Sequence, residues 1–315
     1  MDPIDRIERR IKLRDVRVLL SVVQAGSMHK AAEHLGTSQP AISRAIADLE
    51  HALGVPLLDR NPRGIEPTQY GEAVIKRGLA VFDELRQSVK DIEFLSDPAV
   101  GELRIGCSEV MAAGPALAVI ERVIRRRPRV QFQIITGSQP VLYRNLTARN
   151  VEFAVVRITE DLIDKQMAVE KLFEEPIVVV AGSQSPWTRR RRINLAELAN
   201  ECWTMPASDT FSGALLEEAF RSCGLTPPRP TVITNSNHMR HRLLATGKFL
   251  TIYPRFSVLP VGKLPSLKTL SVDLPNAWGA IAVVTLRNRT LSPLAQLFIE
   301  NLRSITKPLM KRGAE

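Results

Sequence analysis

The chain has 315 residues, of which 44% are hydrophobic and 24% charged, a composition that suits two or three globular domains. It contains no run near the roughly 18 consecutive apolar residues of a membrane span, and its acidic N-terminus is unlike a signal peptide, so we expect a cytoplasmic protein without a membrane partner. The net charge is +10, but residues 1–95 hold equal numbers of basic and acidic side chains, so bulk charge does not locate a nucleic-acid site.

Three helices are predicted near the N-terminus. Residues 12–24 place apolar side chains at helical spacing, and Ser27 can cap a short second helix over residues 28–35. Gly36 ends that helix, because only glycine enters the left-handed region without a steric cost. A third helix runs from about residue 38 to 53, with a proline in its first turn. Two helices joined by so tight a turn are typical of a helix-turn-helix.

The third helix has two faces. Ile42, Ile46 and Leu49 recur at helical steps and are expected to face inward. Polar residues on the opposite face can reach base edges or phosphates in a major groove, and they are Ser38, Gln39, Ser43 and Arg44. A plain helical hairpin in a core would explain the apolar set but would leave the polar set without a role.

A wing and a long helix follow. Residues 55–67 contain three prolines and a glycine, which indicates a small hairpin, and Arg60 and Arg63 on it would contact phosphates or a minor groove. Thr68 caps a helix that reaches about residue 95. Apolar residues and a glycine recur along it in alternating three- and four-residue steps, at Ile75, Gly78, Phe82, Leu85, Val89 and Ile92. This spacing predicts a coiled-coil seam that pairs two subunits; the alternative is a helix packed on its own domain.

Beyond a short linker, apolar strands alternate with helices, which predicts parallel βαβ units. The strands are expected at residues 103–106, 130–135, 153–156, 177–181, 203–205, 231–234, 249–253 and 280–284, and the helices at 112–127, 139–149, 213–223, 237–246 and 292–306. Three cysteines are too few and too scattered for a disulfide framework, so Cys107, Cys202 and Cys223 are expected to be reduced and mostly buried. A redox pair of Cys202 with Cys223 is the alternative.

Residues 13–68 resemble the N-terminal domain of LysR-type transcriptional regulators. The matching positions are Ala31, Ala32, Leu35, the run from Ser38 to Arg44, Leu49, Glu50, Leu53, Gly54, Leu57, Leu58, Arg60, Arg63, Thr68 and Gly71. The chain departs from the family at Met28 and His29, where phenylalanine and threonine are usual. The resemblance implies that Gln39, Pro40, Ser43 and Arg44 touch DNA.

The resemblance extends more weakly over residues 101–306 and implies an α plus α/β fold. The implied parts are a winged helix-turn-helix domain over residues 11–68, with its helix-turn-helix at 28–47, a dimerising linker helix over 68–95, and an effector domain over 101–306. That last domain resembles type 2 periplasmic binding proteins, with subdomain I over 101–172 and 273–306 and subdomain II over 173–272.

In such folds ligands bind beyond the carboxyl ends of strands. Polar residues follow four predicted strand ends, and we take them as the candidate effector site: Ser108, Glu109, Thr136, Ser138, Ser208, Thr210 and Asn235. Hydroxyl groups and free N–H groups suit a small polar metabolite, often a carboxylate. Glu109 would repel an anion unless it is paired, which leaves the charge of the ligand open.

The expected function is sequence-specific binding of double-stranded operator DNA under the control of this effector. The family implies a homodimer, commonly a homotetramer, with RNA polymerase as a further partner. An enzyme is the main alternative, but the nucleophile-elbow, dinucleotide and phosphate-loop motifs are missing, so we expect no catalytic residue and no cofactor. His238 and His241 have metal-ligand spacing without a third ligand, so no metal is expected. The run from Arg189 to Arg192 is interpreted as a solvated loop, with a nucleic-acid patch as the alternative.

Overall fold

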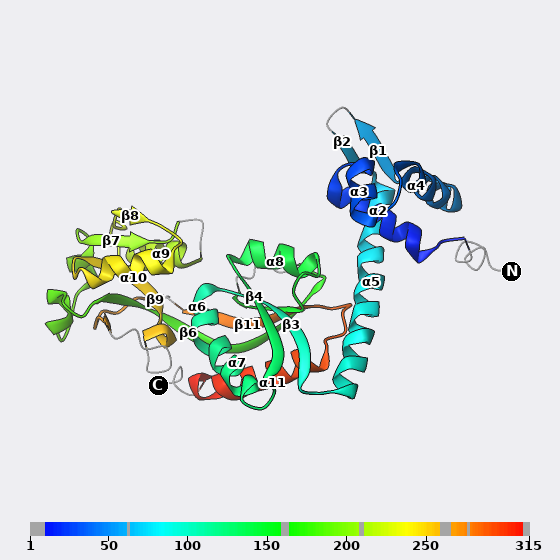
Figure 1. Cartoon of the computed structure of the whole chain (residues 1–315). Helices are drawn as coiled ribbons and strands as arrows, with labels where there is room; N and C mark the ends of the chain where they lie inside the picture. The colour runs from blue at the N-terminus through cyan, green and yellow to red at the C-terminus, as the bar shows by residue number, and fades with distance from the viewer. Residues whose placement is uncertain are drawn as a thin grey trace. The chain divides into compact units, whose positions relative to one another are not determined.

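The structure is a computed structural model that describes residues 10–61, 64–158, 164–207, 211–258, 266–275 and 278–310. It divides into two compact units, residues 1–89 and residues 90–315, and the boundary lies within one long helix (Figure 1). None of the helices in the described ranges combines the length and the hydropathy that a bilayer crossing requires. Each unit has a hydrophobic core of its own.

The N-terminal unit is a small helical domain with a two-stranded hairpin. Its elements are α2 (Leu13–Ala25), α3 (Met28–Leu35), α4 (Gln39–Leu53), β1 (Leu58–Asn61), β2 (Gly64–Pro67) and the first part of α5 (Gln69–Ser96). The three short helices begin and end within a residue of their predicted positions. Gly26 and Gly36 end α2 and α3 with φ values of 66° and 61°, which glycine adopts without strain. Ser27, expected to cap α3, makes no side-chain capping hydrogen bond.

The core of this unit is built from the apolar faces of α2, α3 and α4. Leu19 of α2 and Ile42 of α4 are almost fully buried, and so is Leu57, which precedes the hairpin. Burying a side chain of this size stabilises the folded state by about 1.5–3 kcal/mol. The small residues Ala31 and Ala32 are also buried, because α3 crosses its two neighbours at close range.

Thr68 caps α5, as predicted. Its hydroxyl accepts a hydrogen bond from the backbone N–H of Gly71 at 3.0 Å and donates one to the carbonyl of Pro56 at 2.7 Å. The backbone N–H of Thr68 also donates to the carbonyl of Leu57 at 3.0 Å. The first turn of α5 is therefore tied to the segment that leads into the hairpin.

The two halves of α5 differ in how their apolar residues are covered. In the first half, Ile75 and Phe82 pack against the core of the N-terminal unit. Gly78 is buried there, and a β-carbon at its position would lie 2.6 Å from a methyl carbon of Val16. The predicted coiled-coil seam was therefore wrong for this half, which packs on its own domain, as in the alternative. The second half leaves apolar side chains exposed, namely Leu85 (48%), Val89 (55%), Ile92 (64%) and Leu95 (82%).

Within the described residues, the second unit contains a nine-stranded sheet flanked by helices. Its strands are β3 (Val100–Cys107), β4 (Arg129–Thr136), β5 (Phe153–Arg157), β6 (Met167–Gly182), β7 (Cys202–Met205), β8 (Val232–Ile233), β9 (Phe249–Pro254), β10 (Leu267–Thr269) and β11 (Trp278–Leu286). They lie in the order β4-β3-β5-β11-β6-β9-β7-β8, and β10 pairs with β6. We call β4, β3, β5, β11 and the start of β6 the first half, and the end of β6, β9, β7, β8 and β10 the second half.

The predicted parallel βαβ units are present, but they make up only part of the sheet. The pairs β3–β4, β3–β5, β7–β8 and β7–β9 are parallel, but β11 is antiparallel to β5 and β6, and β6 is antiparallel to β9. Strand β6 also begins at Met167, ten residues before the predicted start at Ile177. Its first part was not recognised in the sequence, because Glu170, Lys171 and Glu174 interrupt the apolar pattern. The strands were recognisable from their apolar runs, which carry no information on direction.

Helices cover both faces of each half of the sheet (Figure 1). They are α6 (Glu109–Met111), a π-helical turn (Ala112–Ala116), α7 (Leu117–Ile124), α8 (Gln139–Thr147), α9 (Phe211–Ser222), α10 (Asn237–Ala245) and α11 (Pro293–Met310). In the first half, Phe153 and Val155 of β5 face α7 and α11, while Ala154 and Val156 face α8. The helix expected over residues 112–127 starts earlier and is broken by non-helical angles at Gly114.

In the second half, α9 and α10 lie on opposite faces of the sheet. Phe220 of α9 packs in the same cluster as Val179 of β6, whereas Leu244 of α10 packs with Val180 and with Tyr253 of β9. Strand β6 thus runs through both halves and contributes to both cores.

The cysteines differ in exposure. Cys107 is buried, and burial raises the pKa of its thiol to about 12. Cys202 and Cys223 are free and exposed, so the expectation of mostly buried thiols was wrong for these two. Both lie at element ends, Cys202 at the start of β7 and Cys223 just after α9, where a short side chain can reach solvent.

Candidate nucleic-acid interface and ligand site

The N-terminal end of α4 presents polar side chains to solvent. Ser38 caps the helix by accepting a hydrogen bond from the backbone N–H of Ala41 at 3.4 Å. Gln39, Pro40 and Arg44 are exposed. The opposite face of the helix is buried in the core, so these side chains are held by a rigid element while their polar ends stay free of it.

Ser43, the remaining predicted residue of α4, is half-buried and already has a partner. Its hydroxyl donates to the sulfur of Met28 on α3 at 3.2 Å. The oxygen of Ser43 keeps its acceptor capacity, because a hydroxyl group carries two lone pairs. Ser43 therefore links the two helices of the turn as well as bordering the exposed surface.

The predicted wing is present as the hairpin of β1 and β2. Arg60 pairs with Ile65 across the two strands, but the side chain of Arg60 and the whole of Arg63 lie outside the described residues. A residue that the sequence analysis did not select supports this hairpin. A side-chain oxygen of Glu50 accepts hydrogen bonds from the backbone N–H groups of Leu57, at 2.7 Å, and Leu58, at 3.3 Å. In the sequence, Glu50 is simply a charged residue next to the core residue Leu49, and this does not predict hydrogen bonds to the hairpin.

In the second unit, the first group of predicted ligand residues gathers beyond β3 and β4. Cys107 and Thr136 are register partners in the parallel pair, so Ser108 follows one strand end next to Thr136 at the other. The hydroxyl of Ser108 accepts from the backbone N–H of Met111 at 3.4 Å, which makes it a helix cap. Thr136 and Ser138 are exposed, and Ser138 makes no side-chain capping bond. Their hydroxyl groups face solvent.

A second group lies beyond β7 and β8. Met205 and Ile233 are register partners, and the backbone N–H of Thr234 donates to the carbonyl of Met205 at 2.8 Å. Asn235 is exposed just past this point, and Ser236 caps α10 by accepting from the N–H of Met239 at 3.2 Å. Two other predicted ligand residues, Ser208 and Thr210, lie outside the described residues.

A buried polar pair, Arg240 and Tyr253, lies beside this second group and was not predicted from the sequence. Arg240 of α10 is only 6% exposed, and its guanidinium carbon lies 4.6 Å from the ring centre of Tyr253. One guanidinium nitrogen donates to the side-chain oxygen of Asn237. The Nε of Arg240 and the hydroxyl of Tyr253 are buried and have no hydrogen-bond partner among the described residues. The sequence drew attention only to the flanking histidines, because arginine is normally exposed.

Electrostatics connects this pair to the first group. Burial lowers the pKa of Arg240, while the nearby Tyr253 and Glu109 raise it. Burial raises the pKa of Tyr253 to about 12, with Arg240 opposing the shift and Glu109 adding to it. The charge of Glu109, on α6, therefore acts on Arg240 and Tyr253, which belong to the other half of the sheet. His241, whose ring centre lies 5.4 Å from that of Tyr253, has its pKa lowered by burial, by Arg240 and by His238.

A second buried polar centre lies on β6, between the two cores. A side-chain oxygen of Glu175 accepts from the backbone N–H of Phe256 at 2.5 Å, and the carbonyl of Glu175 accepts from Arg157 at 3.2 Å. Burial raises the pKa of Glu175 to about 7, against the N–H of Phe256 and the charges of Arg157 and Arg255. Burial also lowers the pKa of Arg157 to about 10, against the charge of Glu175. This centre joins the strand shared by both halves to the segment after β9.

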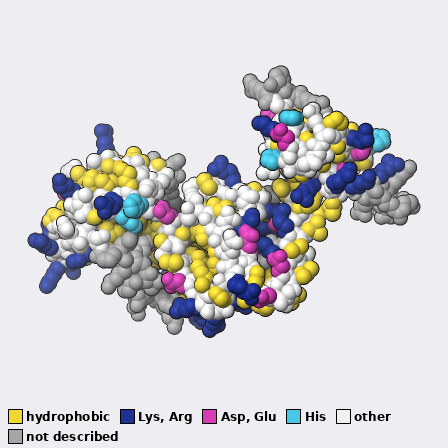
Figure 2. All heavy atoms as spheres, in the orientation of Figure 1, with side chains coloured by type: hydrophobic (Ala, Val, Ile, Leu, Met, Phe, Trp, Pro, Cys, Tyr) yellow, Lys and Arg dark blue, Asp and Glu magenta, His cyan; other side chains and the backbone are white. Residues whose placement is uncertain are grey.

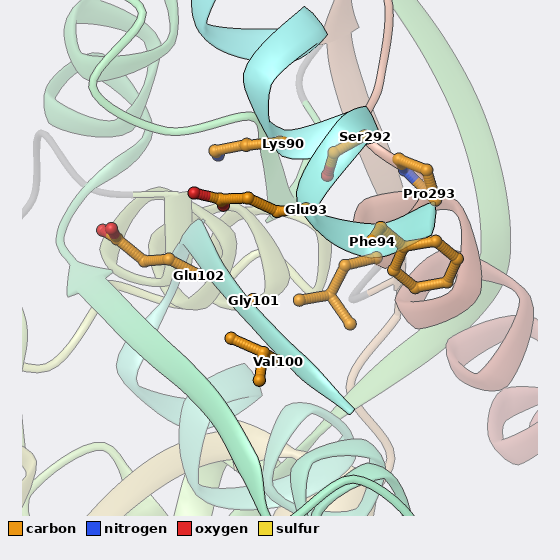
Figure 3. Close-up of a pocket in the computed structure, with 9 residues that line it drawn as sticks. Lys90, Glu93, Phe94, Val100, Gly101, Glu102, Ser292 and Pro293 are labelled. Atoms are coloured by element: carbon orange, nitrogen blue, oxygen red, sulfur yellow. The ribbon is translucent and has the colours of Figure 1, made fainter. Parts of the chain in front are cut away.

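A shallow pocket marks where the end of α5 meets the sheet of the second unit (Figure 3). Figure 3 shows the charged ends of Lys90, Glu93 and Glu102 on one side of the pocket and the ring of Phe94 beside Pro293 on the other. Lys90 forms an ion pair with Glu152, which is buried and also accepts from the backbone N–H of Ser292 at 3.2 Å. None of the predicted ligand residues lines this pocket, so we interpret it as part of the attachment of the helix.

The two remaining sequence features have local partners. In the run from Arg189 to Arg192, Arg190 forms an ion pair with Glu197 at 2.9 Å and lies 5.6 Å from the ring centre of Trp187. His238 is exposed and His241 is half-buried. These contacts agree with the interpretation of the arginine run as a solvated loop.

Comparisons with known proteins agree with this architecture. Residues 96–306 match the model of the LysR substrate binding domain, and residues 13–72 match that of the bacterial regulatory helix-turn-helix protein, lysR family. The regulator GbpR of Azospirillum brasilense is 26% identical over 98% of this chain and 91% of its own length. A full-length OxyR variant of Pseudomonas aeruginosa shares the fold with a TM-score of 0.68, at 19% identity over 95% of this chain and 97% of its own.

A further solved relative is CbnR, a full-length structure in complex with its target DNA. It has a TM-score of 0.54 at 19% identity, over 94% of this chain and 99% of its own. The predicted fold class, a helix-turn-helix followed by an α/β ligand-binding domain, is confirmed by these matches.

Proposed function

The chain belongs to the LysR family of bacterial transcriptional regulators, and from this premise we propose that α4 reads operator DNA while the two groups of strand-end residues hold a small effector. The chain is accordingly a DNA-binding transcriptional regulator with an effector-binding domain.

One observation carries the DNA-binding assignment. The end of α4 that leaves the core exposes Gln39, Pro40 and Arg44, while the rest of the helix is anchored by its apolar face. Glutamine and arginine are the side chains that pair bidentately with adenine and guanine in a major groove. A recognition helix makes its base contacts from its N-terminal residues. Ser38 and Ser43 would contact the backbone of the DNA, and Arg60 and Arg63 on the wing would add phosphate contacts.

Self-association follows from the uncovered half of α5. Pairing of two such helices would bury Leu85, Val89 and Ile92 and would present two copies of α4 to the halves of a palindromic site. We extend the proposal to a homotetramer and to contact with RNA polymerase, as the family implies.

We further propose that the protein acts in the cytoplasm, where bacterial DNA lies. The residues assigned to DNA and to the effector have binding roles, and none of them is assigned a catalytic role.

The effector would act by a shift in population. Ser108, Glu109, Thr136 and Ser138 belong to the first half of the sheet, and Asn235 belongs to the second. A small polar metabolite that contacts both groups would favour one arrangement of the halves over others. It can do so only to the extent that it binds the two arrangements with different affinity.

The test is retention of genomic DNA fragments by the purified full-length protein, followed by sequencing. The wild-type protein should retain a small set of fragments that share a motif with two-fold symmetry. A variant with both Gln39→Ala and Arg44→Ala should lose that enrichment and keep an unchanged thermal unfolding midpoint, because both side chains are exposed. Retention of the same fragments by the variant, or of none by the wild type, would contradict the assignment.

A further inference from the structure

We infer that the effector is a zwitterion, bound by its anionic group to Arg240 and Tyr253 and by its cationic group to Glu109. The inference rests on the proposed effector-binding function and adds to it the chemical class of the ligand. It also adds two residues, Arg240 and Tyr253, to those selected from the sequence.

Arg240 is a buried cation. It forms no ion pair within the described residues, and its hydrogen-bond partner Asn237 is neutral. A buried charge without a hydrogen-bonded counter-charge is costly, which makes Arg240 a candidate for pairing with an anionic group of a ligand. The ring of Tyr253 and the side chain of Asn237 hold the guanidinium in one orientation, so little freedom is lost when an anion binds.

Arg240 and Tyr253 each have one buried donor without a partner. Arg240 keeps its Nε–H free, and Tyr253 keeps its hydroxyl free, although both groups are buried. The phenol is neutral near pH 7, because burial raises its pKa to about 12, so it can donate a hydrogen bond. A guanidinium N–H and a phenol hydroxyl, both buried and without a partner, are the kinds of donor from which a carboxylate accepts hydrogen bonds.

Glu109 offers the opposite charge. It is exposed at the start of α6, and it forms no ion pair within the described part of the chain. Its charge lies close enough to raise the pKa of Arg240. A simple anion on Arg240 would be repelled by this negative charge, which disfavours binding. A ligand that also carries an ammonium group removes the conflict, because Glu109 then becomes its second partner.

The surroundings fit one positive and one negative group. Figure 2 shows histidine and basic side chains gathered over α10, with an acidic side chain close by. The pKa of His241 is lowered by burial, Arg240 and His238, so His241 adds no second positive charge near pH 7. A zwitterion would therefore pair with Arg240 in the second half of the sheet and with Glu109 in the first. Such a ligand joins the two halves, whereas a ligand with one charge engages only one of them.

The test uses the full-length protein and three matched pools of probes. The pools are the standard α-amino acids, the corresponding 2-hydroxy acids, in which a hydroxyl replaces the ammonium, and the α-amino acid amides, in which the carboxylate is neutralised. With each probe at about 10 mM, a ligand of sub-millimolar affinity should raise the unfolding midpoint by about 5 °C. The inference predicts this rise for the amino-acid pool alone, and the single members of that pool then identify the ligand.

Three variants decide which residues are used. Glu109→Gln and Arg240→Gln should each weaken binding of the identified amino acid by at least about tenfold, because each removes one charge partner. Arg240→Lys keeps the charge and should retain part of the affinity, which guards against a loss of response that comes only from misfolding. Arg242→Gln, on the same helix, is the matched control and should respond like the wild type.

Several results would overturn the inference. An equal rise with the hydroxy acids, or an unchanged response in Glu109→Gln, would make the site an anion site only. No rise with any pool in the wild type would make Arg240 a structural residue. Retention of operator fragments by these variants is measured in parallel. If the wild type retains no operator fragments, the proposed function is contradicted. If it retains them but its unfolding midpoint does not rise with the amino-acid pool, only this inference is contradicted.

Discussion

A β-carbon at Gly71 would lie 2.0 Å from the carbonyl oxygen of Leu57. The two backbones can approach this closely only because residue 71 has no side chain. The contact fixes the first turn of α5 against the segment that enters the wing, and Thr68 and Glu50 support the same segment by hydrogen bonds. The wing and the long helix are therefore positioned together.

The first prediction tests this contact. Gly71→Ala should destabilise the N-terminal unit by about 2–4 kcal/mol, because the methyl group meets backbone atoms that cannot rotate away. Chemical denaturation of the full-length protein would measure the loss. Ser88→Ala, at an exposed position of the same helix, is the control and should change stability little. Equal midpoints for the two variants would mean that the backbone at position 71 shifts freely.

The second prediction concerns base reading by α4. Arg44→Ala should weaken binding to a specific operator by about 1–3 kcal/mol if the guanidinium reads a base edge. Fluorescence anisotropy at fixed salt would measure it, with random DNA as the reference. Arg122→Ala removes the same charge from an exposed site on α7 and should bind the operator like the wild type. An equal loss on random DNA would assign Arg44 to a phosphate instead.

The third prediction concerns the uncovered half of α5. Leu85→Asp should break the pairing of subunits through α5 and lower the mass of the assembly, because a charged group would be buried in an apolar seam without a partner. Light scattering coupled to size-exclusion chromatography would report the mass. Leu117→Asp makes the same change at a leucine on α7 that is exposed to a similar degree, 46% against 48%, and should leave the dimer intact. A Leu85→Asp variant with the same mass as the wild-type assembly would place the interface elsewhere.

The fourth prediction concerns pH. The pKa of Glu175 is raised from 4.5 to about 7, mainly by burial. The folded protein therefore keeps a proton there that the unfolded chain releases above pH 4.5. This contribution to stability is complete below pH 4.5 and is lost as the pH rises through 7. Glu175→Gln cannot titrate, so its stability relative to the wild type should increase over this interval, by about 3 kcal/mol at most.

Thermal or chemical unfolding at pH 5, 6, 7 and 8 would measure this trend. These values include the raised pKa of Glu175. The control is Glu174→Gln at the exposed neighbouring position, which should keep the pH dependence of the wild type. A constant difference between wild type and Glu175→Gln across the range would show that Glu175 does not titrate there.

Local signals in the sequence were sufficient for the helix-turn-helix. Gly36 ends one helix, Pro40 and Ser38 begin the next, and the apolar steps of α4 decide which of its faces is buried. Each of these signals acts within a few residues, so the sequence alone predicted both the elements and the exposed position of Gln39 and Arg44. The same holds for most strands of the second unit, which are short apolar runs, but β10 was not predicted and the first part of β6 was missed.

Tertiary structure decided what depends on distant partners. The apolar repeat of α5 continues past Phe82, but only the fold determines that the first half is covered within its own domain and the second half is not. The direction of β11 and the burial of Arg240 beside Tyr253 are likewise set by segments far apart in the chain. Spacing along the sequence predicts which side chains share a face of one element. Packing in three dimensions determines which other element covers that face and which charges meet there.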